Sequence, residues 1–263
     1  MEKRNVLFVM SSLRNGGAER SLVNLLQLLD YDRYNVDLLL FQNEGMFLKQ
    51  VPKAVNIISN CNKLYTLYDN NKAEALKHPY LSAVHIIGTF ISRKKTNSVA
   101  KSRQYRWEHF YKKIVPKLTK EYDVAIAYMQ REQTYFLVDK VKAAKKITWV
   151  HNEYSQLGHF KEMDLEYFEK VDKVVTISDL CAKDLKENFP SIAEKFVVLP
   201  NLTSSQVIRS LAKEFYPPEF KRDMLNIVSI GRLNAQKGFE FALDAALELK
   251  KSKDADLEFL AQY

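Results

Sequence analysis

The sequence contains only two cysteines in 263 residues, Cys61 and Cys181, which lie far apart and without a Cys-x-x-Cys spacing. Neither a disulfide framework nor a zinc site is therefore expected, and reduced thiols in a cytoplasmic protein are the simpler interpretation. Hydrophobic residues make up 46% of the chain and charged residues 27%, which is ordinary for a globular protein with a substantial core.

Long apolar runs are also missing. The run Ala83–Ile91 is interrupted by His85 and is far shorter than the roughly 20 residues that a membrane-spanning helix needs. Near the N-terminus, Val6–Met10 is too short for the core of a signal peptide, and no small-residue cleavage site follows it. We expect neither a transmembrane segment nor a signal peptide.

Acidic residues are almost absent between Arg93 and Lys120, a segment with ten Lys or Arg and one acid, Glu108. Because the whole chain has a net charge of +8, its basicity belongs to this segment rather than to the fold. Aromatic residues alternate with the cations, a composition suited to anionic lipid headgroups. The expected membrane-surface residues are Arg103, Arg106, Trp107, Lys112 and Lys113, and the neighbouring aromatics are Tyr105, Phe110 and Tyr111.

One other interpretation of this basic segment stays open. It could be a solvated helix whose aromatic side chains face the core. Nucleic-acid binding is not expected, because no recognition motif accompanies the charge.

Short apolar runs alternate with segments of helical periodicity, which predicts an α/β fold with a parallel sheet. The predicted strands are Asn5–Met10, Val36–Phe41, Val55–Ile58, Asp123–Tyr128, Lys146–Val150, Lys173–Ile177 and Lys195–Leu199. The predicted helices are Ala18–Leu29, a short piece at Met46–Val51, Lys72–Lys77, Tyr105–Leu118, Thr134–Val141, Asp179–Asn188 with Ser178 as N-cap and Pro190 as stop, Gln206–Phe215 and Phe239–Lys251.

The pair Pro217-Pro218 indicates a linker between two domains. We predict a Rossmann-like first domain at 1–205, a linker at 206–222 and the start of a second Rossmann-like domain at 223–263. The second domain would contain a strand at Asn226–Ile230, the last helix and a strand at Leu257–Leu260. Because one βαβ unit cannot bury both faces of its sheet, this domain is expected to be incomplete.

A candidate anion site lies in the stretch Ser229–Phe239, where Gly231 ends a predicted strand and Phe239 begins a helix. The free N–H groups and the dipole of a helix N-terminus favour an anion, and Arg232 and Lys237 add two cations. A pyrophosphate would suit this site. The alternative for Lys237 is a solvated lysine before a helix.

Two further candidates follow predicted strands of the first domain. Gly16-Gly17 would let a ligand approach the backbone at a helix N-terminus, although a tight turn without a ligand is equally possible. His151 directly follows a strand, where ligands of open α/β sheets bind. Its alternative is a satisfied structural histidine.

Taken in order, these motifs resemble the GT-B glycosyltransferases of the family 4 type, many of which build bacterial capsular polysaccharide, exopolysaccharide or lipopolysaccharide. The likeness extends over essentially all of the chain. The motifs are Gly16-Gly17-Ala18-Glu19-Arg20, Trp149-Val150-His151-Asn152, Thr176-Ile177-Ser178, Pro200-Asn201 and Gly231-Arg232-Leu233 with Lys237-Gly238.

The resemblance implies a role for each matching residue. Arg232 and Lys237 would hold the diphosphate of a UDP- or GDP-linked sugar donor and stabilise its departure, and His151 would lie near the transferred sugar. The other donor- or acceptor-binding positions would be Gly16, Gly17, Glu19, which positions its loop, Asn152, Asn201 and Gly231. Such enzymes usually retain anomeric configuration, transfer a hexosyl group and need neither a metal nor a cofactor.

The last three residues, Ala261-Gln262-Tyr263, stand where the family continues with a glycine-rich turn and, later, a pair of glutamates. We therefore expect a chain shortened in its donor domain. The main hypothesis is a glycosyltransferase for a saccharide or lipid-linked acceptor, located in the cytoplasm or peripherally on the inner face of the plasma membrane. The alternatives are an inert fragment that binds at most a membrane or acceptor, and a sugar-nucleotide epimerase of the same architecture.

Overall fold

The computed structural model describes residues 2–58, 62–68, 76–203, 208–209, 212–216, 218, 220, 226–231, 233 and 237–251. The chain divides into two compact units, Met1–Thr203 and Ser204–Tyr263. Each unit is described by itself below.

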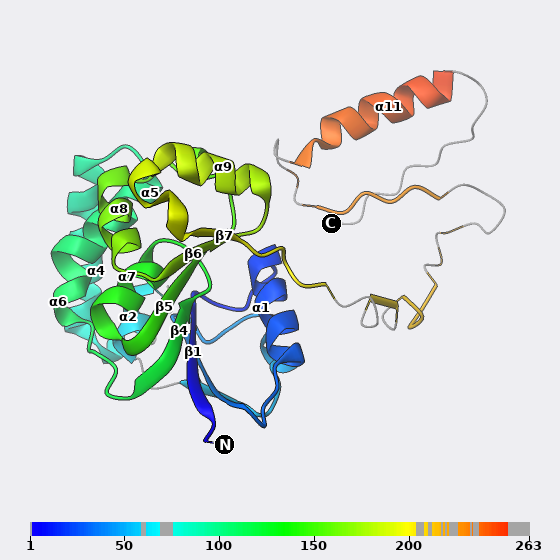
Figure 1. Ribbon diagram of the computed structural model, residues 1–263. Coiled ribbons are helices and arrows are strands. Elements are labelled where there is room, and N and C mark those ends of the chain that lie inside the picture. The colour runs from blue at the N-terminus through cyan, green and yellow to red at the C-terminus, as the bar shows by residue number, and fades with distance from the viewer. Residues whose placement is uncertain are drawn as a thin grey trace. The chain divides into compact units, whose positions relative to one another are not determined.

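The first unit is built on one seven-stranded sheet in which every pair of neighbouring strands is parallel. The strand order is β3-β2-β1-β4-β5-β6-β7 (Figure 1). The central strand β1 pairs with β2 on one side and with β4 on the other. The strands are β1 Arg4–Met10, β2 Tyr34–Leu40, β3 Val55–Ile58, β4 Glu121–Ala127, β5 Lys142–Val150, β6 Lys173–Thr176 and β7 Phe196–Val198.

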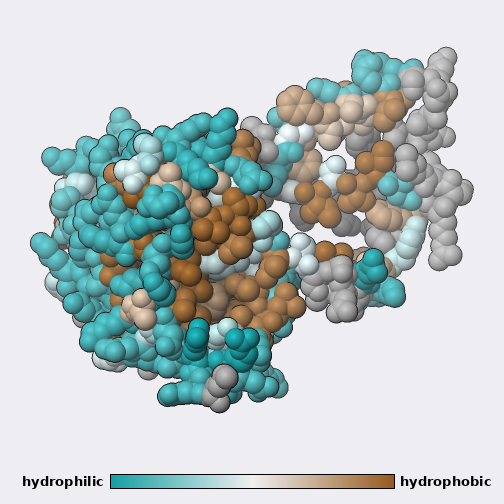
Figure 2. All heavy atoms as spheres, viewed as in Figure 1, coloured by the Kyte–Doolittle hydropathy of each residue, from teal (hydrophilic) through white to brown (hydrophobic). Residues whose placement is uncertain are grey.

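Helices cover both faces of this sheet, and for this reason the Val6–Met10 part of β1 is apolar. Phe8 packs with Leu22 and Leu26 of α1, whereas Leu7 packs with Phe136 of α7 on the opposite face. Figure 2 shows mainly hydrophilic side chains on the outside of these helices. The helices of this unit are α1 Gly17–Leu28, α2 Asn62–Tyr68, α4 Pro79–Lys95, α5 Val99–Arg106, α6 Lys112–Ile114, α7 Glu132–Lys140, α8 Lys161–Glu169 and α9 Asp179–Asn188; shorter turns are η1 Leu48–Gln50, the π-helix η2 Trp107–Tyr111, η3 Tyr154–Gln156 and η4 Pro190–Lys195.

The structure confirms the parallel α/β fold and all seven strands that were predicted for the first unit. The helix α9 has the predicted bounds, and Ser178 caps it by accepting a hydrogen bond from the Cys181 N–H at 3.3 Å. The helices α4 and α8 were not predicted. The helical segment before Pro116 ends at Ile114 rather than at Leu118, because the residue before a proline disfavours helical geometry.

In the second unit, the predicted helix is confirmed as α11 Phe239–Lys251. The predicted strand at Asn226–Ile230 is wrong, since these five residues are described without strand structure. The predicted strand Leu257–Leu260 lies outside the described residues, as does most of the helix predicted at Lys72–Lys77. In the helix predicted at Gln206–Phe215, Ile208 and Arg209 are helical, the described residues Ala212–Phe215 are not, and the other four lie outside the described part.

The prediction of a membrane-surface position is wrong for Trp107. Trp107 is fully buried and donates from Nε1 to Asp139 at 3.0 Å, and Tyr111 is buried beside it. Arg103 turns toward the buried Glu132. The interpretation that fits is the alternative of a helix whose aromatic residues face the core. The remaining cations of the predicted surface are Arg106, which donates to Ser92, Lys112, which pairs with Glu108, and Lys113, on the three-residue helix α6.

A tight backbone contact positions the loop that follows β1. Gly45 has a φ of 128°, and a Cβ built on it would lie 1.9 Å from the carbonyl oxygen of Leu13. The Leu13 N–H donates to the Glu44 carbonyl at 2.9 Å, and the Phe47 N–H donates to the Leu13 carbonyl at 3.1 Å. The loop after β2 therefore holds the loop that leads into Gly16.

Replacing Gly45 by alanine should lower the free energy of unfolding by about 2 kcal/mol or more, because both the φ angle and the Leu13 carbonyl oppose a Cβ. Urea unfolding would measure this loss. Gly17→Ala is the matched control, since a Cβ there meets nothing within 4 Å. Equal stability of the two variants would contradict the contact.

Candidate functional site

The candidate site lies at the carboxyl edge of the sheet, where strand order reverses between β1 and β4. From β1 the chain leads to α1 on one side, and from β4 it continues to α7 on the other. Open α/β sheets bind ligands at this kind of reversal, because the loops on its two sides diverge. Gly16, Gly17 and His151 all follow carboxyl ends of strands in this sheet.

The carboxylate of Glu19 covers the glycine loop at Gly16. Gly16 is the N-cap of α1, and Glu19, in the first turn, folds back over it. A Cβ on Gly16 would lie 2.0 Å from Glu19 Oε2, so the carboxylate would have to move aside for any larger residue there. The Glu19 carboxylate thus lies at the positive end of the helix, and the open side of the loop is at Gly17.

His151 is buried and held in one tautomer. Its Nε2 lies 3.0 Å from the carbonyl oxygen of Tyr128, so Nε2 carries the proton and Nδ1 is an acceptor. Nδ1 is buried and has no hydrogen-bond partner. Burial lowers the pKa of His151 to about 4, although the Tyr128 carbonyl opposes the shift, so the ring is neutral at neutral pH. It can accept a hydrogen bond and cannot serve as a proton donor there.

Tyr128 links this histidine to the glycine-loop helix. Its ring lies 5.3 Å from that of His151 and stacks on Trp149 at 5.0 Å. Its hydroxyl is 2.9 Å from Ser21 Oγ on α1. The predicted site residues after β1 and β5 are therefore joined through a residue that sequence reasoning did not single out.

The remaining predicted residues are placed as follows. Asn152 and Asn201 are exposed, the first just after β5 and the second beyond β7. In the second unit, a Cβ on Gly231 would lie 3.3 Å from Lys237 Cγ, so this lysine packs against the glycine. Arg232 lies outside the described residues. No group of three potential metal-ligating side chains is found in the described ranges.

A charged cluster after β4 was missed entirely by the sequence analysis. Glu132 is 1% exposed and pairs with Arg103, while Arg131 Nε lies 3.8 Å from its other oxygen. Burial tends to raise the pKa of Glu132, but the two arginines outweigh it and hold the pKa below its ordinary value. The same carboxylate raises the pKa of Arg103. All three groups are therefore charged at neutral pH.

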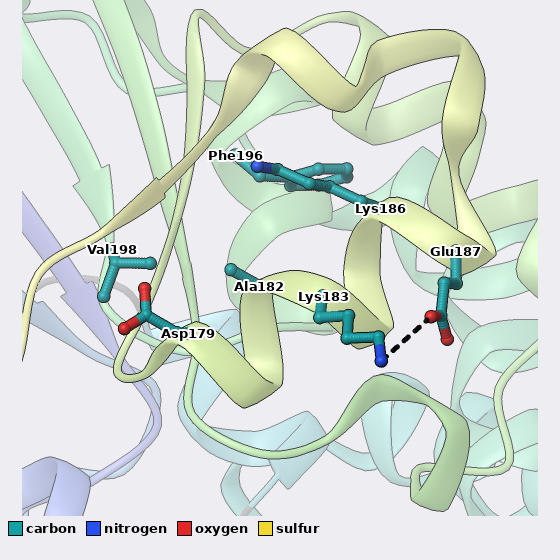
Figure 3. A pocket seen from close by; sticks show the side chains of 7 residues that line it. All are labelled: Asp179, Ala182, Lys183, Lys186, Glu187, Phe196 and Val198. Carbon is teal, nitrogen blue, oxygen red and sulfur yellow. Dashed lines mark ion pairs between the residues drawn. The ribbon is translucent and has the colours of Figure 1, made fainter.

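A cavity of about 500 Å³ lies elsewhere on the first unit, between α9 and β7 (Figure 3). Lys183 and Glu187, one turn apart on α9, form an ion pair at 3.9 Å beside the cavity. Phe196 lines the cavity from β7. None of its lining residues is a predicted site residue. The lining residues are Asp179, Ala182, Lys183, Lys186, Glu187, Phe196 and Val198.

No family model and no curated protein matches the sequence. The structure is similar to that of HepE (Alr3699) from Anabaena in complex with UDP-glucose, with a TM-score of 0.42 and 14% identity, covering 80% of this chain and 49% of that one. It is also similar to a glycosyltransferase from Rickettsia africae ESF-5, with a TM-score of 0.39 and 18% identity, covering 81% and 50%. The chain spans about half the length of these two proteins. Because both TM-scores are below 0.5, we base the functional proposal on the chain's own residues.

The buried neutral state of His151 predicts a pH-dependent stability. The unfolded chain takes up a proton near the ordinary pKa of 6.5, whereas the folded chain does so only near 4. The folded state therefore loses stability as pH falls, by about 1 kcal/mol between pH 7 and 5.5. Urea unfolding of the wild type and of His151→Gln at both pH values would measure the difference. An equal loss in both proteins would contradict the prediction, because His85 and the carboxylates are common to both.

Proposed function

We propose that this chain belongs to a GT-B glycosyltransferase of the family 4 type, which transfers a hexosyl group with retention from a UDP- or GDP-linked donor. The acceptor would be a saccharide or a lipid-linked saccharide of surface polysaccharide synthesis. The first unit would bind the acceptor, and the second would contribute the donor diphosphate site.

In the proposed reaction, the bond between the sugar C1 and the phosphate oxygen breaks, and its electron pair stays on the nucleoside diphosphate. The acceptor hydroxyl oxygen forms the new bond to C1, and its proton leaves with the departing phosphate. Lys237, with Arg232, would stabilise the charge that develops on that phosphate. His151 would accept a hydrogen bond from a sugar hydroxyl through Nδ1, since Nε2 is engaged by Tyr128.

The observation that supports this proposal most is the link from His151 through Tyr128 to Ser21 on α1. It ties the end of β5 to the helix of the glycine loop across the reversal in strand order, so that two motifs far apart in the sequence share one rigid edge. The contact of Lys237 with Gly231 supports the second part of the proposal, because it holds the cation at the start of α11.

Calorimetric titration of the chain with UDP-glucose and with a GDP-linked sugar would test donor binding. We expect micromolar binding of one of them and a loss of at least about tenfold in Lys237→Ala, because a charge-assisted hydrogen bond to phosphate contributes about 1.5–3 kcal/mol. Lys251→Ala, a lysine at the other end of α11, is the control. Absence of donor binding would favour the inert alternative, and release of free nucleotide without acceptor would favour an epimerase.

A second candidate function, docking on an anionic membrane, is favoured by helix α4 rather than by the residues first predicted. Four large side chains on its outer side are 53% to 67% exposed: Tyr80, Ile86, Ile87 and Phe90. At about 100° per residue these four positions lie within about 120° of the helix circumference, so they form one stripe. No helix in the described part of the chain is long and apolar enough to cross a bilayer.

The charges of α4 are all of one sign. Its last turn contains Arg93, Lys94 and Lys95, the helix has no acidic residue, and Lys94 Nζ lies 4.4 Å from the centre of the Phe90 ring. An apolar stripe that ends in cations is typical of helices that lie in the headgroup region of an anionic membrane. The opposite side of α4 is anchored in the protein through Leu81, Gly88 and Ser92.

Vesicle co-sedimentation would test this surface. The chain should pellet with vesicles of phosphatidylcholine and phosphatidylglycerol and less with phosphatidylcholine alone. The double variant Ile86→Ser, Phe90→Ser should lose most of the binding, because it removes apolar area that enters the membrane. Leu28→Ser, an equally exposed change on α1, is the matched control. Unchanged pelleting of the double variant would contradict a role for α4.

A further inference from the structure

The cluster around Glu132 contains an unusual number of unused hydrogen-bonding groups. In the described part of the chain, four buried polar atoms without a partner gather there: Tyr68 Oη, Arg106 Nε, Arg131 Nε and Glu132 Oε2. Arg103 and Arg131 both flank Glu132, and Tyr68 interacts with Glu132, Arg103 and Arg106. Three of the four atoms are donors, because burial raises the pKa of Tyr68 and keeps its hydroxyl protonated. Unused buried donors call for an acceptor.

The same cluster has more positive than negative charge. Arg103 and Arg131 flank a single carboxylate, Glu132, and Arg106 interacts with the adjacent Tyr68, so these groups have three positive charges and one negative charge. His85, which contacts the neighbouring Tyr111, adds no charge at neutral pH because burial and Arg106 lower its pKa. Charges that are taken out of water are normally paired. The cluster therefore lacks an anion.

Arg131 adopts a backbone conformation that opposes its side chain. Its φ of 73° and ψ of −126° correspond to the first central position of a type II′ turn, where glycine is favoured. It is the one non-glycine residue with positive φ in the described part of the chain. Strain of this kind gathers at binding sites, because the side chain itself is needed there.

We infer that Arg103 and Arg131 form a phosphate-binding site at the carboxyl end of β4. Both side chains are partly open to solvent, 31% and 26% exposed, while Glu132 between them is closed off. Their guanidinium groups bind the phosphate oxygens directly, and guanidinium groups suit phosphate because they present paired donors. Glu132 is a positioning residue, which holds the two arginines beside each other.

Arg103 and Arg131 belong to the first unit, whereas Lys237, the proposed donor diphosphate position, belongs to the second. The contacts among Arg103, Arg131 and Glu132 do not depend on which reaction the chain catalyses. Its assignment to the acceptor rests on the proposed function: the acceptor would then bring a phosphate group to the first unit, either as a lipid diphosphate or as a soluble phosphorylated saccharide.

Calorimetric titration with sodium pyrophosphate, performed on the full chain carrying Lys237→Ala, tests the site without the donor position. Binding should persist in this background and should weaken at least about tenfold when Arg131→Gly is added. Arg131→Gly relieves the turn but removes one of the two cations beside the buried Glu132, so the thermal unfolding of the variant is measured alongside its binding. Loss of binding in a variant that still unfolds cooperatively does not come from misfolding.

Arg33→Gln is the matched charge control, since Arg33 is exposed at the amino end of β2, the opposite edge of the sheet. Absence of pyrophosphate binding in the Lys237→Ala chain, or equal binding after Arg131→Gly is added, would overturn the site. Neither result would bear on the proposed donor site, which the donor titration of Lys237→Ala tests separately. Farnesyl diphosphate separates the two sources. Tighter binding than that of pyrophosphate supports a lipid diphosphate, and equal binding supports a soluble phosphate.

Discussion

The structure depends on the burial of both faces of a parallel sheet. Because α1 covers one face of β1 and α7 covers the other, the Val6–Met10 part of that strand is apolar. Polar groups that can reach a ligand lie beyond the carboxyl ends of the strands, and the reversal between β1 and β4 sets where the loops there separate. The same constraint accounts for the position of the glycine loop, His151 and Arg131.

At the carboxyl edge of the sheet, the charge of an ionisable side chain depends on its surroundings more than on its residue type. His151 is buried beside aromatic rings with only a carbonyl as its partner, so it stays neutral. Glu132 is buried more deeply and yet stays ionised, because two arginines offset the cost of removing its charge from water. The free ring nitrogen of His151, Nδ1, can thus only accept a hydrogen bond, whereas the Glu132 carboxylate can fix cations in place.

The strands of the first unit could be predicted because each contains a short apolar run, which the helices on the two faces of the sheet bury. Helix α4 could not, since it has apolar residues on its exposed side as well as at Leu81, and this hides its periodicity. Trp107 was assigned to the surface because composition does not tell which side of a helix faces inward. Arg131 had no signal in the sequence at all, because its importance comes from a φ angle and from Arg103, which is distant in the chain.

The basic segment shows why net charge alone does not locate a binding surface. Its cations lie in different environments. Arg103 pairs with a buried carboxylate, Lys112 pairs with Glu108 on the surface, and Lys94 lies over an exposed aromatic ring. Only the last arrangement combines a cation with exposed apolar area, as membrane docking requires. Only the first places a cation where water is scarce, and there an anion gains most from binding. Pairing and burial, rather than the count of lysines and arginines, divide this segment into a candidate membrane surface and a candidate phosphate site.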